Sequence, residues 1–323
     1  MKIAITSALA LALVGPATAA AHADNYPSRT VTVVVPFPAG GSVDGVARIL
    51  VQKLNETMGQ HFIVENRAGG ASGIVGANAV AKAAPDGYTL LLSASVHVIN
   101  PFLYKSVPYD VVHDFTPVTL LAEGPLIVST TPSVPANNLK DFFALVRKDP
   151  QQYTFGATTI GSASHLAIEL LKLDAGLDTL VVAYKGTAPA LTDLMSGQIQ
   201  LLADPMLSSL PLAQGGKIKA LGLTSLKRAA AAPDIPTVAE SGVKGFAFVS
   251  WYGLWGPKNL PVDISEKLQA EIAKLLALPD AKARLNALGF DPIGTGGEQF
   301  ALYIREEVAK YEKIIKDAKI KLE

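Results

Sequence analysis

The stretch Thr30–Leu50, TVTVVVPFPAGGSVDGVARIL, passes from a valine-rich strand through a Pro/Gly turn directly into an amphipathic helix. Pro36 and Pro38 end the hydrogen-bond ladder of the strand, and the Gly-Gly pair lets the backbone approach a ligand closely. The helix begins near Ser42, where unpaired N–H groups and the dipole favour an anion. No Gly-Lys-Ser/Thr follows, so a carboxylate suits this loop better than a nucleotide does. An ordinary connection without ligand is the alternative.

Residues 1–23 have the features of a secretory signal peptide. Lys2 is the charged start, residues 3–14 are apolar, and Ala21-His22-Ala23 is a small-x-small cleavage site. Removing this segment from the 323-residue chain leaves 300 residues, which at roughly 150 residues per domain predicts about two domains. We expect a protein exported to the periplasm and cleaved after Ala23, with no further membrane span.

Composition excludes several classes of partner. The chain has no cysteine, so it has neither a disulfide nor a lipid-modified cysteine at the mature N-terminus. Without Lys2, 27 basic residues face 28 acidic ones, a formal charge of −1. Such a balance provides no overall field for nucleic acid or anionic lipid, so local groups must select the ligand.

The chain contains a weak internal duplication, in which each copy reads strand, helix, strand, helix, strand. The first copy has strands near 31–35, 62–65 and 88–93, with helices over 43–58 and 74–83. The second has strands near 153–157, 180–184 and 199–203, with helices over 164–175 and 188–196. Each copy is therefore expected to form an open, mostly parallel α/β sheet that binds ligands at the carboxyl ends of its strands.

Two such sheets predict two lobes that face each other across a cleft. Long apolar strands near 118–130 and 246–255 would connect them, so that lobe 1 comprises about 24–121 plus 255–323 and lobe 2 about 122–250. The tail is predicted to form helices over 263–276, 279–288 and 297–319. The last helix carries a stripe that we interpret as core: Phe300, Ile304, Val308, Tyr311 and Ile314.

Candidate ligand-binding residues cluster in the loops at the carboxyl ends of these strands. In lobe 1 they are Phe37, Ala39, Gly40, Gly41, Ser42, Asp44, Ser93, Ser95 and His97. In lobe 2 they are Thr158, Ser162, Ser164, His165, Tyr184, Lys185, Gly186, Thr187 and Asp204. Alternatives remain open: Ser162 or Ser164 can simply cap a helix, His165 can be a packing residue, and Lys185 can be solvated. The 69–76 segment, GGASGIVG, lacks dinucleotide spacing and is interpreted as a turn and helix start beside the cleft.

Catalytic and metal chemistry have little support in the sequence. There is no Gly-x-Ser-x-Gly elbow, because Gly161-Ser162-Ala163-Ser164-His165 ends in histidine. The histidines at 61, 97, 113 and 165 have no metal-ligand spacing. We therefore expect no enzyme, no cofactor and no metal; a serine hydrolase assembled in space, with Ser162 as nucleophile, is the minor alternative.

Several independent motifs resemble those of the Bug family, the periplasmic solute-binding components of tripartite tricarboxylate transporters. They are PFPAGGSVDGVAR, ENRAGGASGIVGANAVAKAAPDGYTLL, GSASH, YKGTAPALTDLMSGQIQ, KRAAAAPDIPTVAESGV and WYGLWGP, and the match extends from Tyr26 to the C-terminus. The resemblance implies a two-lobed type II periplasmic-binding-protein fold. It also implies that the 38–44 loop, the Ser/His loop and the Tyr-Lys-Gly loop hold a carboxylate through amides, hydroxyls and water. Departures at Ala39 and at 156–160 bear on the identity of the ligand.

The predicted function is that of a monomeric receptor that binds a di- or tricarboxylate between closing lobes and delivers it to membrane permease subunits. An aromatic dicarboxylate is one candidate, because Phe37, Trp251 and Tyr252 offer ring surfaces. Trp251 can equally be hinge core. A binding protein that serves a sensor kinase is the other reading that the sequence leaves open.

Overall fold

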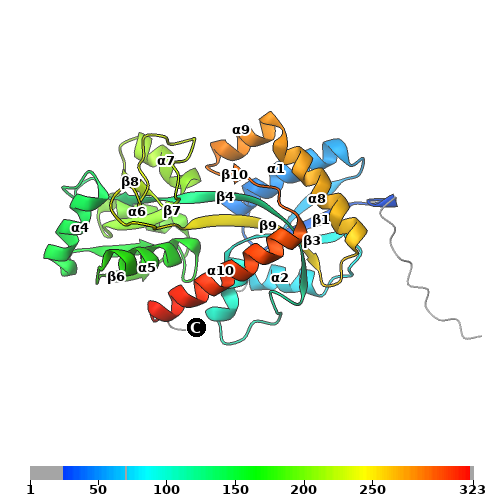
Figure 1. The fold of residues 1–323 in the computed structure, drawn as a ribbon, viewed down its shortest axis with the longest axis horizontal. Coiled ribbons are helices and arrows are strands. Elements are labelled where there is room, and N and C mark those ends of the chain that lie inside the picture. Colours follow the sequence, from blue (N-terminus) through cyan, green and yellow to red (C-terminus); the bar gives the residue numbers. More distant parts are fainter. Residues whose placement is uncertain (1–24, 70, 321–323) are drawn as a thin grey trace, which may run out of the picture.

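The computed structural model describes residues 25–69 and 71–320, so the predicted signal peptide lies outside the described residues. Figure 1 shows an elongated α/β molecule with two halves joined by the long strands β4 and β9. Strands β2, β1, β3, β9, β4, β7, β5 and β6 follow one another in that order in one continuous sheet, and β8 and β10 pair with β4. The two-lobed α/β architecture predicted from the sequence is confirmed.

The first half is a parallel sheet covered by helices. β1 (Val31–Val35) lies between β2 (Phe62–Asn66) and β3 (Thr89–Ala94), parallel to both. The crossovers are α1 (Ser42–Thr57) and α2 (Ile74–Ala81), followed after β3 by the short α3 (Val96–Ile99). The valines of β1 are buried because helices cover both faces of a parallel sheet.

The second half repeats this arrangement. β5 (Thr154–Ala157) lies between β6 (Leu180–Ala183) and β7 (Leu201–Pro205), again parallel to both. The crossovers are α5 (Ala163–Ala175) and α6 (Thr187–Ser196). Three elements lie beyond the predicted repeat: α4 (Leu139–Lys148), α7 (Met206–Gln214) and β8 (Lys219–Leu223).

The predicted connections at 118–130 and 246–255 fall on β4 (Phe115–Thr130) and β9 (Val249–Pro257). The two strands are antiparallel partners along 115–125 and 249–257, with two register shifts in β4. Beyond Pro125, β4 pairs with β7 and β8 of the second half. A Cβ atom added to Gly124 would lie 2.4 Å from the carbonyl oxygen of Gly289, so only glycine fits at this point of β4.

The C-terminal segment after β9 returns to the first half, and its last helix then packs against the second half. It forms α8 (Val262–Ala277), α9 (Pro279–Ala287), the short β10 (Asp291–Pro292) and α10 (Gly297–Asp317). α10, drawn red in Figure 1, packs against β4, α3 and α8 and also against α5. It therefore connects the two halves independently of β4 and β9.

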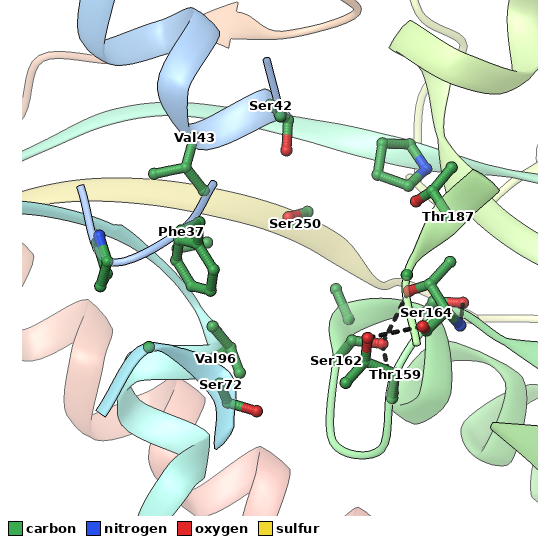
Figure 2. A pocket seen from close by; sticks show the side chains of 18 of the residues that line it. Phe37, Ser42, Val43, Ser72, Val96, Thr159, Ser162, Ser164, Thr187 and Ser250 are labelled. Atoms are coloured by element: carbon green, nitrogen blue, oxygen red, sulfur yellow. Dashed lines mark hydrogen bonds between the residues drawn. The ribbon is translucent and has the colours of Figure 1, made fainter. Parts of the chain in front are cut away.

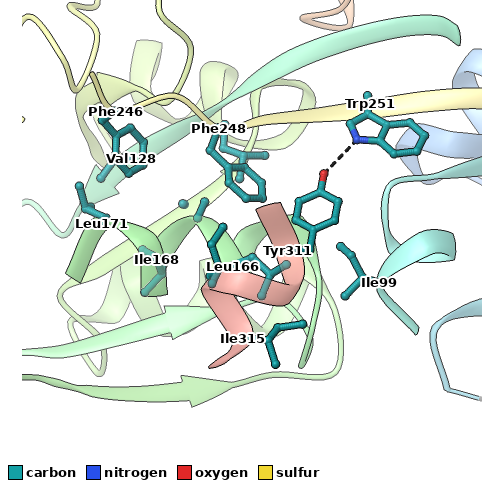
Figure 3. Packing of buried hydrophobic residues seen from close by; sticks show 14 of the residues in the cluster. Ile99, Val128, Leu166, Ile168, Leu171, Phe246, Phe248, Trp251, Tyr311 and Ile315 are labelled. Carbon is teal, nitrogen blue, oxygen red and sulfur yellow. Dashed lines mark hydrogen bonds between the residues drawn. The ribbon is translucent and has the colours of Figure 1, made fainter. Parts of the chain in front are cut away.

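The predicted stripe of α10 is core. Phe300, Ile304, Tyr311 and Ile314 are buried, and Val308 packs against the same cluster. Figure 3 shows Tyr311 reaching Trp251 of β9: the indole Nε1–H donates to the Tyr311 hydroxyl at 2.9 Å and to Glu307 Oε2 at 3.0 Å. Trp251 is fully buried, so it belongs to the core and is not a ligand surface.

Candidate functional site

A cleft with a volume of about 580 Å³ lies between the two halves, at the carboxyl ends of the parallel strands. The loops after β1 and β3 line one side, the loops after β5 and β6 line the other, and β4 and β9 contribute residues between them. Figure 2 shows Phe37, Val43 and Val96 on the first side and Thr159, Ser162, Ser164 and Thr187 on the second. The cleft is where the duplicated α/β sheets predict a ligand site.

Asp44 holds the first-half loop in shape from behind. Its carboxylate accepts hydrogen bonds from the Gly40 N–H at 2.9 Å, Arg48 Nε at 2.8 Å and Asn66 Nδ2 at 3.0 Å. Burial raises the pKa of Asp44, but the bonds from Arg48, Gly40 and Asn66 outweigh burial and hold the pKa below its usual value. The left-handed conformation of Gly40, with φ at 86°, lets the loop turn back to this carboxylate.

The Ser/His loop forms the first part of the opposite wall. Ser162 caps α5, where its Oγ accepts the N–H of His165 at 3.3 Å. Ser162 also donates to the carbonyl oxygen of Thr159 at 2.8 Å, and the Thr158 N–H donates to Ser164 Oγ at 3.1 Å. These bonds fix several hydroxyl groups at the N-terminus of α5.

His165 supports this loop from inside the second half. Its Nδ1 accepts the Gly161 N–H at 3.0 Å, while its Nε2 lies 3.8 Å from Glu169 Oε1. Burial, with Lys172 nearby, lowers the pKa of His165 to about 4, so the ring is neutral at pH 7. Since Ser162 donates to a backbone oxygen and Nδ1 already accepts the Gly161 N–H, Ser162 and His165 are not arranged as a nucleophile and its base.

The loop before α6 completes the second wall. The Gly186 N–H donates to the carbonyl oxygen of Thr158 at 2.7 Å, which joins the two second-half loops. Thr187 donates to Asp204 Oδ1 at 2.9 Å, and Ser209 donates to Asp204 Oδ2 at 3.0 Å. Burial raises the pKa of Asp204 to about 6, against the lowering effect of its hydroxyl partners. Asp204 therefore orients Thr187 from below the cleft surface.

The cleft carries no charge of its own. Among the residues the structure describes, no Lys, Arg, His, Asp or Glu side chain lines it. Instead, the N-termini of α1, α5 and α6 contribute loop and first-turn residues to its walls. Helix N-termini present free N–H groups and a positive dipole end, so this neutral surface is suited to an anion.

Ten of the predicted site residues line the cleft. They are Phe37, Ala39, Gly41, Ser42, Ser95, Thr158, Ser162, Ser164, Gly186 and Thr187. The 69–76 segment also contributes, through Gly69, Ser72 and Gly73.

Eight predicted site residues do not line the cleft, and each has another place in the fold. Gly40, Asp44, His165 and Asp204 support the loops from behind, as described above, and Ser93 is buried in β3. Tyr184 donates to Asp193 Oδ2 at 2.7 Å, and Lys185 is exposed outside the cleft lining.

His97 lies in an aromatic cluster away from the cleft surface. Its ring centroid is 4.7 Å from that of Phe115, 5.1 Å from Trp255 and 5.5 Å from Tyr109. Neither ring nitrogen has a hydrogen-bond partner among the described residues, and burial lowers the pKa to about 3. The position after β3 predicted a ligand contact, but the side chain turns into the core.

Sequence reasoning missed several lining residues. Val43 and Val96 directly follow the predicted residues Ser42 and Ser95, but an apolar side chain carries no sequence signal for an anion site. Thr159 is adjacent to the predicted Thr158, and its hydroxyl-rich context was an available signal. Ser250 lines the cleft from β9, where no loop signal marks it.

Two α/β lobes that enclose an uncharged, hydroxyl-lined cleft define the class of solute-binding proteins, and comparison with known proteins identifies the family. The model of the tripartite tricarboxylate transporter family receptor (TctC) matches residues 46–320, so the chain belongs to this family. The resemblance to Bug proteins is confirmed. These are receptors that bind solutes, and the chain is not an enzyme.

Three solved structures illustrate the relationship. The periplasmic binding protein BugD is 36% identical, covers 92% of this chain and 100% of its own, and superimposes with a TM-score of 0.81. R. palustris Rpa4515 with adipate is 35% identical (91% and 98% covered, TM-score 0.84). MatC from Rhodopseudomonas palustris with bound malate is 34% identical (90% and 100% covered, TM-score 0.78). The similarity covers both lobes and confirms the periplasmic-binding-protein fold.

No helix among the described residues is both long and apolar enough to cross a membrane. Nor do those residues contain a group of three or more His, Cys, Asp and Glu side chains that could hold a metal ion.

Proposed function

We propose that this protein binds a small carboxylated solute in the cleft and delivers it to the permease subunits of a tripartite tricarboxylate transporter. The observation that carries the proposal is the convergence of three helix N-termini on a cleft wall without charged side chains. Adipate and malate in the two related structures support a carboxylate as the solute. Export with cleavage after Ala23 and action as a monomer are parts of the same proposal.

Binding is coupled to closure of the lobes. A solute that touches both walls gains hydrogen bonds and contacts only when the lobes approach, so it shifts the population toward the closed form. Loops 36–41 and 158–162 approach it from opposite sides, with the hinge strands between them. The proposed lobe boundaries are those given by the sequence, 24–121 plus 255–323 and 122–250.

Titration calorimetry of the mature protein with hexanoate, adipate, malate, citrate and benzoate tests the binding step. Ser164→Ala removes a cleft hydroxyl, and losing a hydrogen bond to a charged group predicts at least about tenfold weaker binding. Ser196→Ala, at the exposed end of α6, is the matched control and should bind as the wild type does. A folded protein that binds none of these carboxylates would refute the proposal.

The delivery step needs a cellular experiment. Cells that lack this protein should lose uptake of the labelled solute identified by calorimetry, and the wild-type chain should restore it. Ser164→Ala should restore less uptake than Ser196→Ala at a solute concentration near the wild-type Kd. Unchanged uptake in cells lacking the protein would separate it from transport and favour a sensory role.

A further inference from the structure

Each half of the molecule holds one carboxylate behind its cleft loops, and the partners of the two carboxylates differ. Asp44 is bonded to the cationic side chain of Arg48, so its negative charge is paired. Asp204 is 0% exposed and receives one hydroxyl hydrogen on each oxygen, from Thr187 at 2.9 Å and from Ser209 at 3.0 Å. It has no cationic partner among the described residues. Because an unpaired buried charge is costly, Asp204 is the carboxylate that a proton would stabilise.

The elements packed against Asp204 bring no cation to it. β4 and β5 flank β7 in the sheet, and α5, α6 and α7 pack against it. Burial raises the pKa of Tyr252 on β9, and the negative charge of Asp204 adds to this rise. The other ionisable side chains of these elements are Glu123, His165, Glu169, Lys172, Asp174 and Asp193. Burial, opposed by the hydroxyl groups of Ser208, Thr187 and Ser209, sets the pKa of Asp204 at about 6.

Thr187 connects this carboxyl group to the cleft. It is the first residue of α6 and lines the second wall, as Figure 2 shows. A threonine hydroxyl has a single hydrogen, and an ionised carboxylate can only accept hydrogen bonds. While Asp204 is ionised, that hydrogen is donated to Asp204 Oδ1. The Thr187 hydroxyl then presents only lone pairs to a solute, and lone pairs repel a carboxylate oxygen.

A proton on Asp204 Oδ1 reverses this hydrogen bond. The acid O–H donates to Thr187 Oγ1, Oδ2 still accepts from Ser209, and the Thr187 hydrogen can turn into the cleft. The proton comes from solvent, and no other covalent bond changes. Protonation also removes a negative charge from beneath an anion site. The first effect acts on a carboxylate that reaches Thr187, and the second acts on an anion anywhere in the cleft.

We infer, on the basis of the proposed function, that Asp204 is a positioning residue for the solute and that solute binding is coupled to uptake of a proton by its carboxyl group. By linkage, the affinity for an anionic solute falls as the pH rises and Asp204 loses its proton. The other two ionisable groups that support the cleft loops do not take part between pH 6 and pH 8. Asp44 stays ionised because its bonds from Arg48 and Gly40 lower its pKa, and burial keeps His165 neutral.

Calorimetry between pH 6 and pH 8 tests the coupling, because hexanoate, adipate, malate and benzoate are largely ionised over this range. The Kd of those that bind should rise with pH, by up to about 50-fold if only the protonated form binds. Titrations at pH 7 in buffers of different ionisation enthalpy should show uptake of up to about one proton per solute. A constant Kd without proton uptake would overturn the inference and leave the carboxylate receptor intact. Absence of binding by every carboxylate would overturn both.

Two variants test the assignment to Asp204 and Thr187. Asp204→Asn supplies an amide donor to Thr187 at every pH, so it should bind with the same Kd at pH 6 and pH 8 and take up no proton. Thr187→Val keeps the shape of the side chain without its hydroxyl, so it should bind more weakly than the wild type at pH 6 and depend less on pH. Asp178→Asn, which is exposed and outside the cleft lining, should keep the pH dependence of the wild type. Proton uptake that persists in Asp204→Asn, or a full pH dependence of the Kd in Thr187→Val, would overturn the assignment.

Discussion

Asp204 is a buried carboxylate whose pKa is raised from 3.8 to about 6, because burial penalises the charged form more than its hydroxyl partners favour it. Its folded-state pKa lies above the unfolded value, so its contribution to stability is fully present below about pH 4. That contribution is lost as the pH rises through 6. The raised pKa corresponds to a decrease of about 3 kcal/mol in the free energy of unfolding at high pH.

Asp204→Asn should remove this loss, so the difference in unfolding free energy between variant and wild type should shift in favour of the variant between pH 4.5 and 7.5. Urea unfolding at four pH values measures the shift. Asp178→Asn, an exposed control, accounts for the general effect of one fewer negative charge. A difference that stays constant with pH would contradict the assignment.

The stability contribution of His97 depends on pH in the sense opposite to that of Asp204. Burial lowers its pKa from 6.5 to about 3, so the folded protein keeps the ring neutral while the unfolded chain protonates. The contribution is complete above pH 6.5 and is lost as the pH falls, by on the order of 5 kcal/mol near pH 3.

His97→Phe should therefore gain stability relative to the wild type on going from pH 8 to pH 5, because phenylalanine fits the aromatic cluster and has no nitrogen left without a partner. Urea midpoints at the two pH values test this, with the exposed His61→Phe as control. Equal relative midpoints at both pH values would count against a neutral buried ring.

At the scale of elements, β4 requires a glycine at position 124, because the chain around Gly289 passes close to it. Gly124→Ala would bring a methyl group against the Gly289 carbonyl and the Phe290 ring. We expect a loss of about 1–3 kcal/mol in unfolding free energy, the usual cost of overpacking. Gly45→Ala is the control: it lies within α1, where the added Cβ meets Leu288 at 3.4 Å, and it should be neutral or stabilising. Equal effects of the two substitutions would argue against the close approach at β4.

The repeated strands and helices were predictable because valine-rich strands and amphipathic helices alternate with Gly/Pro loops. α7 was not predicted, since Pro211 interrupts its pattern and packing of Met206 against Ile127 and Leu223 supports it. α4 did carry a usable signal: Asn138 caps it by accepting the Asp141 N–H at 2.9 Å.

The location of the cleft was predictable, but the direction in which the neighbouring ionisable side chains point was not. Sequence places Asp44, His97 and Asp204 at the right strand ends, yet each turns toward its own half of the molecule. The two carboxylates find local hydrogen-bond donors, because an unpaired buried charge is costly, whereas His97 stays neutral inside an aromatic cluster. Valines 43 and 96 complete the cleft where polar residues were expected.

For the molecule as a whole, β4, β9 and α10 connect the halves so closely that one should not unfold without the other. Both tryptophans lie in β9, so their fluorescence reports the hinge, whereas far-UV circular dichroism reports both halves. The two signals should change together in urea, as in a two-state transition. Separate midpoints would show that the halves unfold independently.

β4 and β9 leave the first half as a hydrogen-bonded ribbon of two strands. A ribbon bends across its face far more easily than it shears within its plane, because shear breaks the ladder between its strands. In the proposed closure, motion between the halves would thereby be confined to nearly one direction, and the same atoms of the two walls would meet each time. Binding of a solute then carries only a small entropic cost for ordering the two halves relative to each other. The accuracy with which the cleft distinguishes solutes is therefore set partly by backbone that the solute never touches.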